Sequence, residues 1–146
     1  FSFLGYNKIM DYMIEPIELP FPPSLNSYYR YIKMGNSCRV LISKEGREYK
    51  KIVKEIIDGL PKKIEMLEGR LVVVVSLHAP TRRKYDLDNR CKSLLDALEE
   101  AEVFLNDEQI DHLTIRRGEY FKNDGKALIQ IIQLGEDENE NPEDES

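Results

Sequence analysis

The sequence predicts an α+β fold in which two main helices pack on a small mixed sheet within a single domain. A β-branched run at 71–75, bounded by Gly69 and Pro80, predicts a buried central strand. Apolar residues recur at three- and four-residue steps in two other segments, which is the period of an amphipathic helix. At 146 residues and 41% hydrophobic content, the chain is long enough for one such domain and too short for two.

The first half of the chain predicts a strand, a long loop, a brief strand and a helix. Residues 14–19 form the strand, and the prolines between positions 20 and 23 force an extended loop through residues 26–30. Residues 39–42 form the brief strand. Ser43 is a good N-cap for the helix, whose apolar face continues until a glycine and a proline end it.

The second half predicts a buried strand, a second helix and two further strands. The buried strand covers residues 70–78, and the helix runs from Asp88 to about residue 102. Its apolar face consists of Cys91, Leu94, Leu95, Leu98 and Ala101. Strands over about 112–121 and 126–134 follow, and the Asp-Gly pair between them favours a tight hairpin turn.

Both ends of the chain differ from the middle. The chain begins with Phe1 rather than methionine, so we interpret residues 1–13 as a disordered or artificially added leader. Residues 135–146 are acidic and almost free of apolar side chains, which predicts a disordered tail. We therefore expect the domain to cover residues 14–134.

The net charge of -6 is unevenly distributed. Seven acidic residues and no basic one lie in 136–146, so residues 1–135 carry 21 basic and 20 acidic side chains. The window 28–54 holds eight basic and two acidic residues, and a basic run at 82–84 directly precedes Asp86. Such clusters are placed to hold the phosphates of a polyanion, although the first window alone fits solvated surface lysines equally well.

Several functional classes find no support in the sequence. Cys38 and Cys91 lie far apart without histidines at ligand spacing, so we expect free thiols. His78 and His112 are isolated, and no Ser-His or Cys-His set is visible. A glycine-rich phosphate loop, a membrane span and a secretory signal are missing, so we expect no nucleotide cofactor, no membrane partner and a soluble, intracellular protein.

An acidic motif, Asp-Leu-Asp-Asn at 86–89, lies where the second helix begins. An extended chain directs its two carboxylates to one side, and Asp88, Lys92 and Asp96 follow at four-residue steps. Paired carboxylates repel unless a cation lies between them, and oxygen ligands suit Mg²⁺ or Mn²⁺. Asp107, in the polar turn after the helix, is our candidate for a third ligand if an antiparallel strand lets it fold back towards the helix start.

A structural interpretation of these residues stays open. Asp86 or Asp88 would then only cap the helix at its positive end, and Asp96 would only pair with Lys92.

Three segments carry a resemblance to a known family. They are 19–30, with prolines followed by an asparagine and Tyr-Tyr-Arg; 82–92, with the basic run, the acidic motif and a lysine; and 105–110, an acidic turn. They resemble the RusA family of Holliday junction resolvases, known from bacteria and their prophages, and the likeness covers most of residues 14–134. The acidic tail is the departure, because the family members that we would compare are more basic.

The resemblance implies a RusA-like fold and an endodeoxyribonuclease that resolves four-way junctions in DNA recombination and repair by paired, symmetric cuts. Asp86, Asp88 and Asp107 would bind Mg²⁺, for which Mn²⁺ can substitute, and Lys92 would stabilise charge on the phosphorane or the leaving oxygen. Two symmetric cuts imply a homodimer with two sites. The implied DNA-binding residues are Arg82, Arg83, Lys84, Asn89, Tyr28, Tyr29 and Arg30.

The expected location is the cytoplasm of a bacterial or phage-infected cell. Two other functions stay open: a metal nuclease that acts on flaps or single strands, and a non-catalytic module that binds branched DNA without metal dependence. Tyr28 and Tyr29 could also be packing residues beside the proline loop, since aromatic side chains bury large areas.

Overall fold

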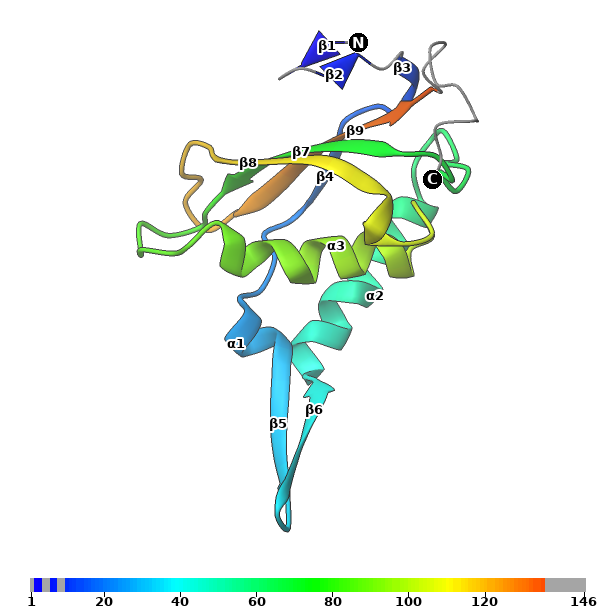
Figure 1. The fold of residues 1–146 in the computed structure, drawn as a ribbon. Coiled ribbons are helices and arrows are strands. Elements are labelled where there is room, and N and C mark those ends of the chain that lie inside the picture. Colours follow the sequence, from blue (N-terminus) through cyan, green and yellow to red (C-terminus); the bar gives the residue numbers. More distant parts are fainter. Residues whose placement is uncertain (1, 4–5, 8–9, 136–146) are drawn as a thin grey trace.

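The computed structural model describes residues 2–3, 6–7 and 10–135, and its centre is a five-stranded sheet (Figure 1). The strand order is β3-β9-β7-β8, and β4 also pairs with β9. The strands are β3 (Met10–Met13), β4 (Ile17–Pro20), β7 (Leu71–His78), β8 (Ile110–Arg117) and β9 (Lys126–Leu134). A separate antiparallel pair consists of β1 (Ser2–Phe3) and β2 (Tyr6–Asn7).

Strand β7 confirms the buried central strand that the β-branched run predicts. It pairs parallel with β8 and antiparallel with β9, so the sheet is mixed. Leu71, Val73 and Val75 are at most 1% exposed and belong to the main core. Because β7 has a partner strand on each side, its backbone groups are bonded within the sheet, and residues on both of its faces are buried.

The predicted hairpin between the last two strands is wrong, because β7 lies between β8 and β9. The connecting segment passes the end of β7, where the Gly118 amide donates to the Leu77 carbonyl at 2.8 Å and the Phe121 amide donates to the Ala79 carbonyl at 3.0 Å. Strand β7 thus pairs with both β8 and β9. The Asp-Gly pair lies in a long connection between these two strands instead of a two-residue turn.

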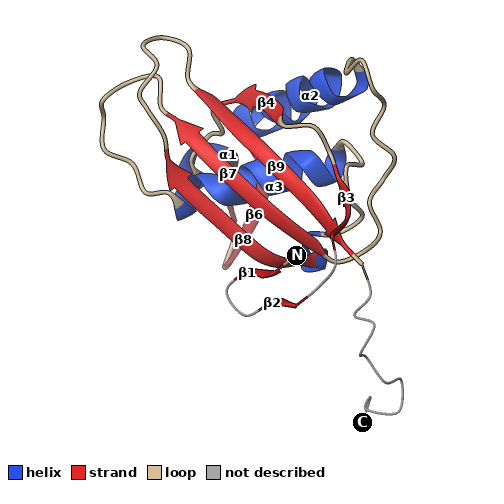
Figure 2. Cartoon of the chain, turned by 90° about the horizontal axis from the view of Figure 1, so that it is seen from above, coloured by secondary structure: helices blue, strands red, loops and turns tan. Residues whose placement is uncertain are grey.

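Two helices, α2 (Lys44–Asp58) and α3 (Cys91–Glu100), cover one face of the sheet (Figure 2). The Ser43 hydroxyl caps α2 as predicted and accepts a hydrogen bond from the Gly46 amide at 3.0 Å. Val53 of α2 and Leu98 of α3 are fully buried, and burying one such side chain stabilises the fold by about 2 kcal/mol. The predicted α+β class with two main helices is confirmed.

Helix α3 is the crossover between the parallel strands β7 and β8. The loop 79–87 leads from β7 into η1 (Asp88–Arg90), which continues into α3, and η2 (Asp107–Gln109) leads into β8. Within the part of the chain that the structure describes, no helix is long and apolar enough to cross a membrane.

The sheet begins earlier than the sequence predicts. Of the expected strand at 14–19, only the second half is a strand, β4, and another strand, β3, precedes it. Both pair with β9, and they are separated at 14–16, where Pro16 interrupts the ladder. Strand β3 therefore lies inside the predicted leader. Of the predicted acidic tail, residues 136–146 lie outside the described residues.

A β-hairpin projects from the helical side of the molecule (Figure 1). A short helix, α1 (Leu25–Tyr28), leads into β5 (Tyr29–Met34), which pairs antiparallel with β6 (Ser37–Ile42). The two-residue turn has Gly35 at φ 60°, which glycine adopts without strain. The predicted loop over 26–30 is therefore wrong, because Tyr and Ile residues favour strands once the prolines are passed. We call residues 29–42 the arm.

Candidate active site

Lys92, in the first turn of α3, is held between two carboxylates. Its Nζ lies 2.9 Å from Asp96 Oδ1 and 3.9 Å from Asp107 Oδ2. The hydrogen bond with Asp96 is the main cause that raises the pKa of Lys92, so the ammonium form is favoured. The predicted four-residue pairing with Asp96 is confirmed. Helix α3 therefore holds a positive charge beside Asp107.

Tyr28 supports this arrangement from inside the protein. Its hydroxyl donates to Asp96 Oδ2 at 2.8 Å, and its side chain is 0% exposed. Burial, together with the hydrogen bond to Asp96, raises the pKa of Tyr28. The alternative of a packing residue thus holds for Tyr28, and its prediction as a DNA contact is wrong because the ring is inaccessible.

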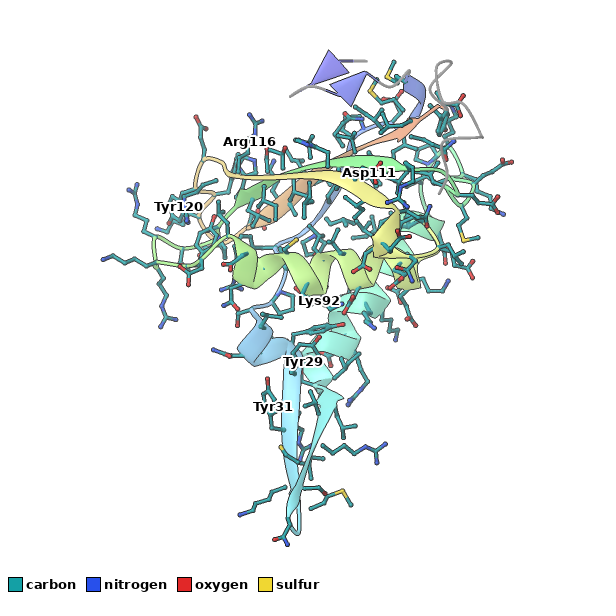
Figure 3. All side chains as sticks on the ribbon, in the orientation of Figure 1. Tyr29, Tyr31, Lys92, Asp111, Arg116 and Tyr120 are labelled. Carbon is teal, nitrogen blue, oxygen red and sulfur yellow. The ribbon has the colours of Figure 1, made fainter. Side chains whose placement is uncertain are left out.

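Tyr29 and Arg30 lie at the root of the arm. The Tyr29 ring is partly exposed and packs edge to face on Tyr28, with ring centroids 4.8 Å apart. Tyr29 also contributes to the raised pKa of Lys92, so the root of the arm lies next to this lysine (Figure 3). Arg30 is exposed. The arm therefore starts beside the candidate active site.

Asp107 begins a turn that Gln109 fixes from inside. Gln109 Oε1 accepts from two backbone amides of the turn at 2.9 and 2.8 Å, and its Nε2 donates to the Leu67 and Gly69 carbonyls at 2.9 and 3.0 Å. The sequence analysis missed Gln109, although an asparagine three residues earlier completes a capping box. The sequence analysis expected Asp107 to fold back towards the helix start if the next strand were antiparallel. That strand, β8, is parallel to β7, so this condition is wrong, but Asp107 still lies 3.9 Å from Lys92.

Asp86 and Asp88 lie before α3 on exposed chain. Asp86 stands near the end of the loop 79–87, and Asp88 is the first residue of η1. The N-cap positions Leu87 and Arg90 make no side-chain cap hydrogen bond. Within the described residues, neither aspartate side chain has a hydrogen bond or an ion pair. The helix-cap alternative therefore gains no support.

Cys91 lies near two of the predicted ligands. Its thiol is partly buried, and burial raises its pKa; the negative charges of Asp107 and Asp88 raise it further. Both carboxylates are therefore within electrostatic range of one side chain. Cys91 and Cys38 are free thiols, as predicted.

The predicted metal centre is not assembled as one cluster. In residues 2–3, 6–7 and 10–135, no group of three or more His, Cys, Asp and Glu side chains is arranged to hold a metal ion. Asp107 lies at Lys92, Asp88 precedes the helix, and Asp86 stands in the exposed loop. The chemistry of the donors still suits a hard cation, because Mg²⁺ usually takes only one or two protein carboxylates and keeps several waters.

Basic and aromatic side chains adjoin the acidic motif. Arg82, Arg83 and Lys84 are exposed in the loop before it, and Asn89 is partly buried in η1. A cavity of about 360 Å³ lies beside this loop, lined by Phe21, Ala79, Pro80, Thr81, Arg83, Lys84, Tyr85 and Arg90. The sequence analysis missed Arg90, whose Nη1 donates to the Pro22 carbonyl at 2.9 Å and ties the helix start to the proline loop.

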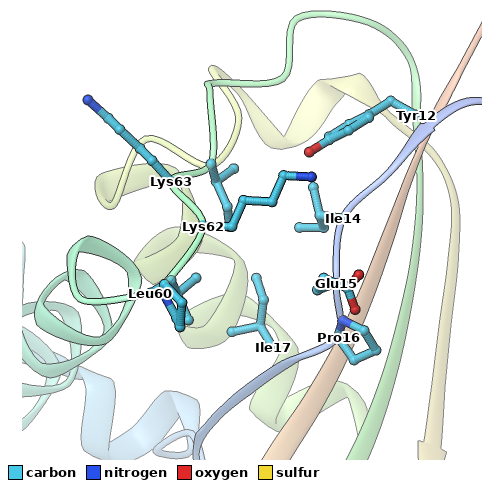
Figure 4. A pocket seen from close by; sticks show the side chains of 10 residues that line it. Tyr12, Ile14, Glu15, Pro16, Ile17, Leu60, Lys62 and Lys63 are labelled. Atoms are coloured by element: carbon cyan, nitrogen blue, oxygen red, sulfur yellow. The ribbon is translucent and has the colours of Figure 1, made fainter.

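Another cavity lies apart from these residues (Figure 4). It has a volume of about 260 Å³ and lies between the segment 12–17 and the segment 60–64 that follows α2. None of the predicted site residues lines it. It is therefore not part of the candidate active site.

Acidic side chains beside an anchored lysine, flanked by exposed arginines, are typical of enzymes that cut phosphodiester bonds, and the class that the fold and the site define is that of a nuclease. Comparison with known families supports this class, since residues 20–132 match the family described as Endodeoxyribonuclease RusA. The chain belongs to the RusA family of endodeoxyribonucleases.

Curated relatives agree with this family along most of their length. The chain is 41% identical over 116 residues to the crossover junction endodeoxyribonuclease rusA of Enterobacteria phage HK97, which covers 80% of this chain and 92% of the relative. It is 37% identical over 123 residues to the protein of the same name from Enterobacteria phage 82, and 36% identical over 123 residues to the one from Escherichia coli strain K12. Each of these two matches covers 82% of this chain and 94% of the relative.

Proposed function

We propose that this protein is a Holliday junction resolvase that cuts four-way DNA junctions by paired, symmetric hydrolysis of phosphodiester bonds. The observation that carries the proposal is Lys92, fixed by Asp96 and lying 3.9 Å from Asp107, in a chain of the RusA family. An ammonium group in this position can stabilise the negative charge that develops on the phosphorane or the leaving oxygen.

Asp88 and Asp107 are the proposed ligands of a Mg²⁺ ion, with Asp86 as a third ligand from the loop. Asp88 begins the short helix η1 four residues before Lys92, and Lys92 Nζ lies 3.9 Å from Asp107 Oδ2, which supports this pairing. Mg²⁺ needs few protein ligands when a phosphate and waters supply the rest. When bound, the ion supplies a Lewis acid and lowers the pKa of a coordinated water. Mn²⁺, with similar oxygen ligands, is expected to substitute.

Arg82, Arg83 and Lys84 are the proposed phosphate contacts, together with Asn89 at the start of the helix. Their exposure in one loop directly before Asp86 supports this role, because cations there would draw the DNA backbone onto the acidic residues. We further propose a homodimer in the cytoplasm, since two symmetric cuts need two sites.

The decisive experiment compares cleavage of a labelled four-way junction, a flapped duplex and a linear duplex of matched sequence, with Mg²⁺ and with EDTA. We expect symmetric, metal-dependent nicking of the junction that Asp88→Asn abolishes, while Asp124→Asn, an exposed carboxylate in the connection before β9, keeps it. Preferred cutting of the flap would replace the proposal by a flap nuclease. Tight junction binding without cutting in any metal would favour the non-catalytic module.

A further inference from the structure

The arm is a largely exposed element that the proposed mechanism does not use. Each of its strands has six residues, so it extends about 20 Å at roughly 3.3 Å per residue. Figure 1 shows it projecting from α1 and the start of α2, away from the sheet. A two-stranded ribbon of this kind is narrow enough for the major groove of DNA, which is about 12 Å wide.

The charge of the arm has one sign. Arg30, Lys33 and Arg39 lie on it and are exposed, and residues 29–42 contain no aspartate or glutamate. Within the described residues, none of these three cations has an ion-pair partner. Unpaired cations on a projecting element form a positive surface that is complementary to phosphates.

The arm also exposes an apolar pair. Tyr31 and Val40 face each other across the two strands and are 65% and 52% exposed. Figure 3 shows Tyr31 on the projecting part of the arm, beyond Tyr29 and Lys92. Exposed apolar side chains that stand together on a projecting element are a candidate contact surface, because burying them against a partner would be favourable.

We propose that the arm binds the branch point of a four-way DNA junction, with Tyr31 and Val40 packed against an exposed base-pair face and Lys33 and Arg39 on the flanking phosphates. The inference rests on the proposed function and adds the surface that recognises the branch. At a branch the end faces of base pairs become accessible, whereas a continuous duplex must be unstacked first, which costs a few kcal/mol. The position of Tyr29 near Lys92 brings the bound branch close to the candidate active site.

The charges favour DNA over a second copy of the chain as the partner. If two arms paired with each other, Arg30, Lys33 and Arg39 of one copy would approach the same cations of the other. Like charges at neighbouring positions of a sheet destabilise the pairing. DNA presents the opposite charge along its whole length.

The test measures binding in EDTA, which prevents cutting, to a four-way junction and to a linear duplex of the same sequence. Tyr31→Thr with Val40→Thr places residues that favour strands at both positions, and we expect about tenfold weaker junction binding with under twofold change for the duplex. Tyr31→Phe should retain the preference for the junction. Lys33→Gln with Arg39→Gln should weaken both complexes and reduce the salt slope of log K by about 1.8, at about 0.9 per lost phosphate contact.

Matched controls lie on the body of the protein. Lys62→Gln with Lys63→Gln removes two exposed cations from the loop after α2, and Met66→Thr removes an exposed apolar side chain; neither should alter the preference for the junction.

Equal loss on junction and duplex for the Tyr31 and Val40 variant would overturn the inference, as would unchanged binding. Dissociation of a wild-type dimer by that variant, seen in ultracentrifugation without DNA, would assign the arm to a second copy. If the wild type itself shows no junction preference, the proposed function fails instead.

Discussion

Asp107 and Asp86 are both predicted to serve the same site, but the protein holds them in different ways. Asp107 stands on a turn whose backbone is bonded to the buried Gln109, and it reaches Lys92, which Asp96 fixes in turn. Asp86 stands in an exposed loop, and among the described residues its side chain has neither a hydrogen bond nor an ion pair. We call Lys92, Asp96 and Asp107, which are held by these contacts, the anchored side of the candidate site. We call the exposed loop 79–87, which carries Asp86, the loop side.

This difference fits the demands of a large, flexible substrate. A group that stabilises developing charge acts best when it needs no reorganisation, as the anchored lysine does. A loop that carries cations and a carboxylate can instead adapt to the DNA backbone. It adopts a fixed conformation when the phosphates neutralise its positive charges. We therefore expect substitutions on the anchored side to affect stability and cleavage, and those on the loop side to affect binding and cleavage only.

The largest effect is expected from removing either candidate ligand. Asp88→Asn and Asp107→Asn should each lower the rate of junction cleavage at saturating enzyme by about 100-fold or more, because an amide is a weak ligand for a hard cation. Single-turnover kinetics with Mg²⁺ measure this loss. Thermal unfolding should shift little for Asp88→Asn, since its carboxylate is exposed. A loss of less than threefold for either variant would remove that residue from the site.

The second prediction concerns the anchored turn. Gln109→Met removes four hydrogen bonds to backbone groups while keeping side-chain volume, so the free energy of unfolding should fall by about 3 kcal/mol. Gln130→Met is the matched control, because the Gln130 side chain donates a hydrogen bond to the Ile14 carbonyl at 2.7 Å, and its loss should lower the free energy of unfolding by about 1 kcal/mol. Urea titration measures both. Equal losses would show that the turn does not depend on Gln109.

The body of the fold was predictable because its signals are local. The β-branched run at 71–75 and the two apolar helix faces determine a buried strand and its covering helices without knowledge of partners. The order of the strands was not predictable in the same way, because Asp124 and Gly125 suit a tight hairpin and only competition for β7 places β8 and β9 on either side of it. The second strand of the arm was predicted in part, as the brief strand at 39–42, which lies within β6. Its first strand, β5, was missed because the prolines at 20–23 dominated the expectation for the residues after them.

The candidate site was predictable as a set of residues, and its arrangement was not. The spacing of Lys92 and Asp96 predicted their contact, which the structure confirms. The burial of Tyr28 and its bond to Asp96 join residues far apart in the sequence, and no spacing rule reports such a contact. The roles of Asp86, Asp88 and Asp107 as ligands remain predictions.

A third prediction tests whether Tyr28 supports the anchored side. Tyr28→Phe removes the hydroxyl that donates to Asp96 and keeps the buried ring, so the free energy of unfolding should fall by about 1.5 kcal/mol. Tyr29→Phe is the control, with an expected change below about 0.5 kcal/mol. Because the folded-state pKa of Tyr28 lies above its ordinary value of 10.0, wild-type stability should decline as the pH rises above about 10, and less steeply in Tyr28→Phe. Identical alkaline profiles would contradict this assignment.

The smallest effect is expected on the loop side. Arg83→Gln removes one exposed cation that has no hydrogen-bonded side-chain partner among the described residues, so the melting temperature should not change. Junction affinity should fall severalfold at low salt, and the slope of log K against log salt should decrease by about 0.9, the value for one phosphate contact. Lys62→Gln, on the loop after α2, should leave the slope unchanged. A destabilised Arg83→Gln with an unaltered slope would mean that the loop is anchored like the turn of Asp107, and the contrast between the two sides of the site would no longer hold.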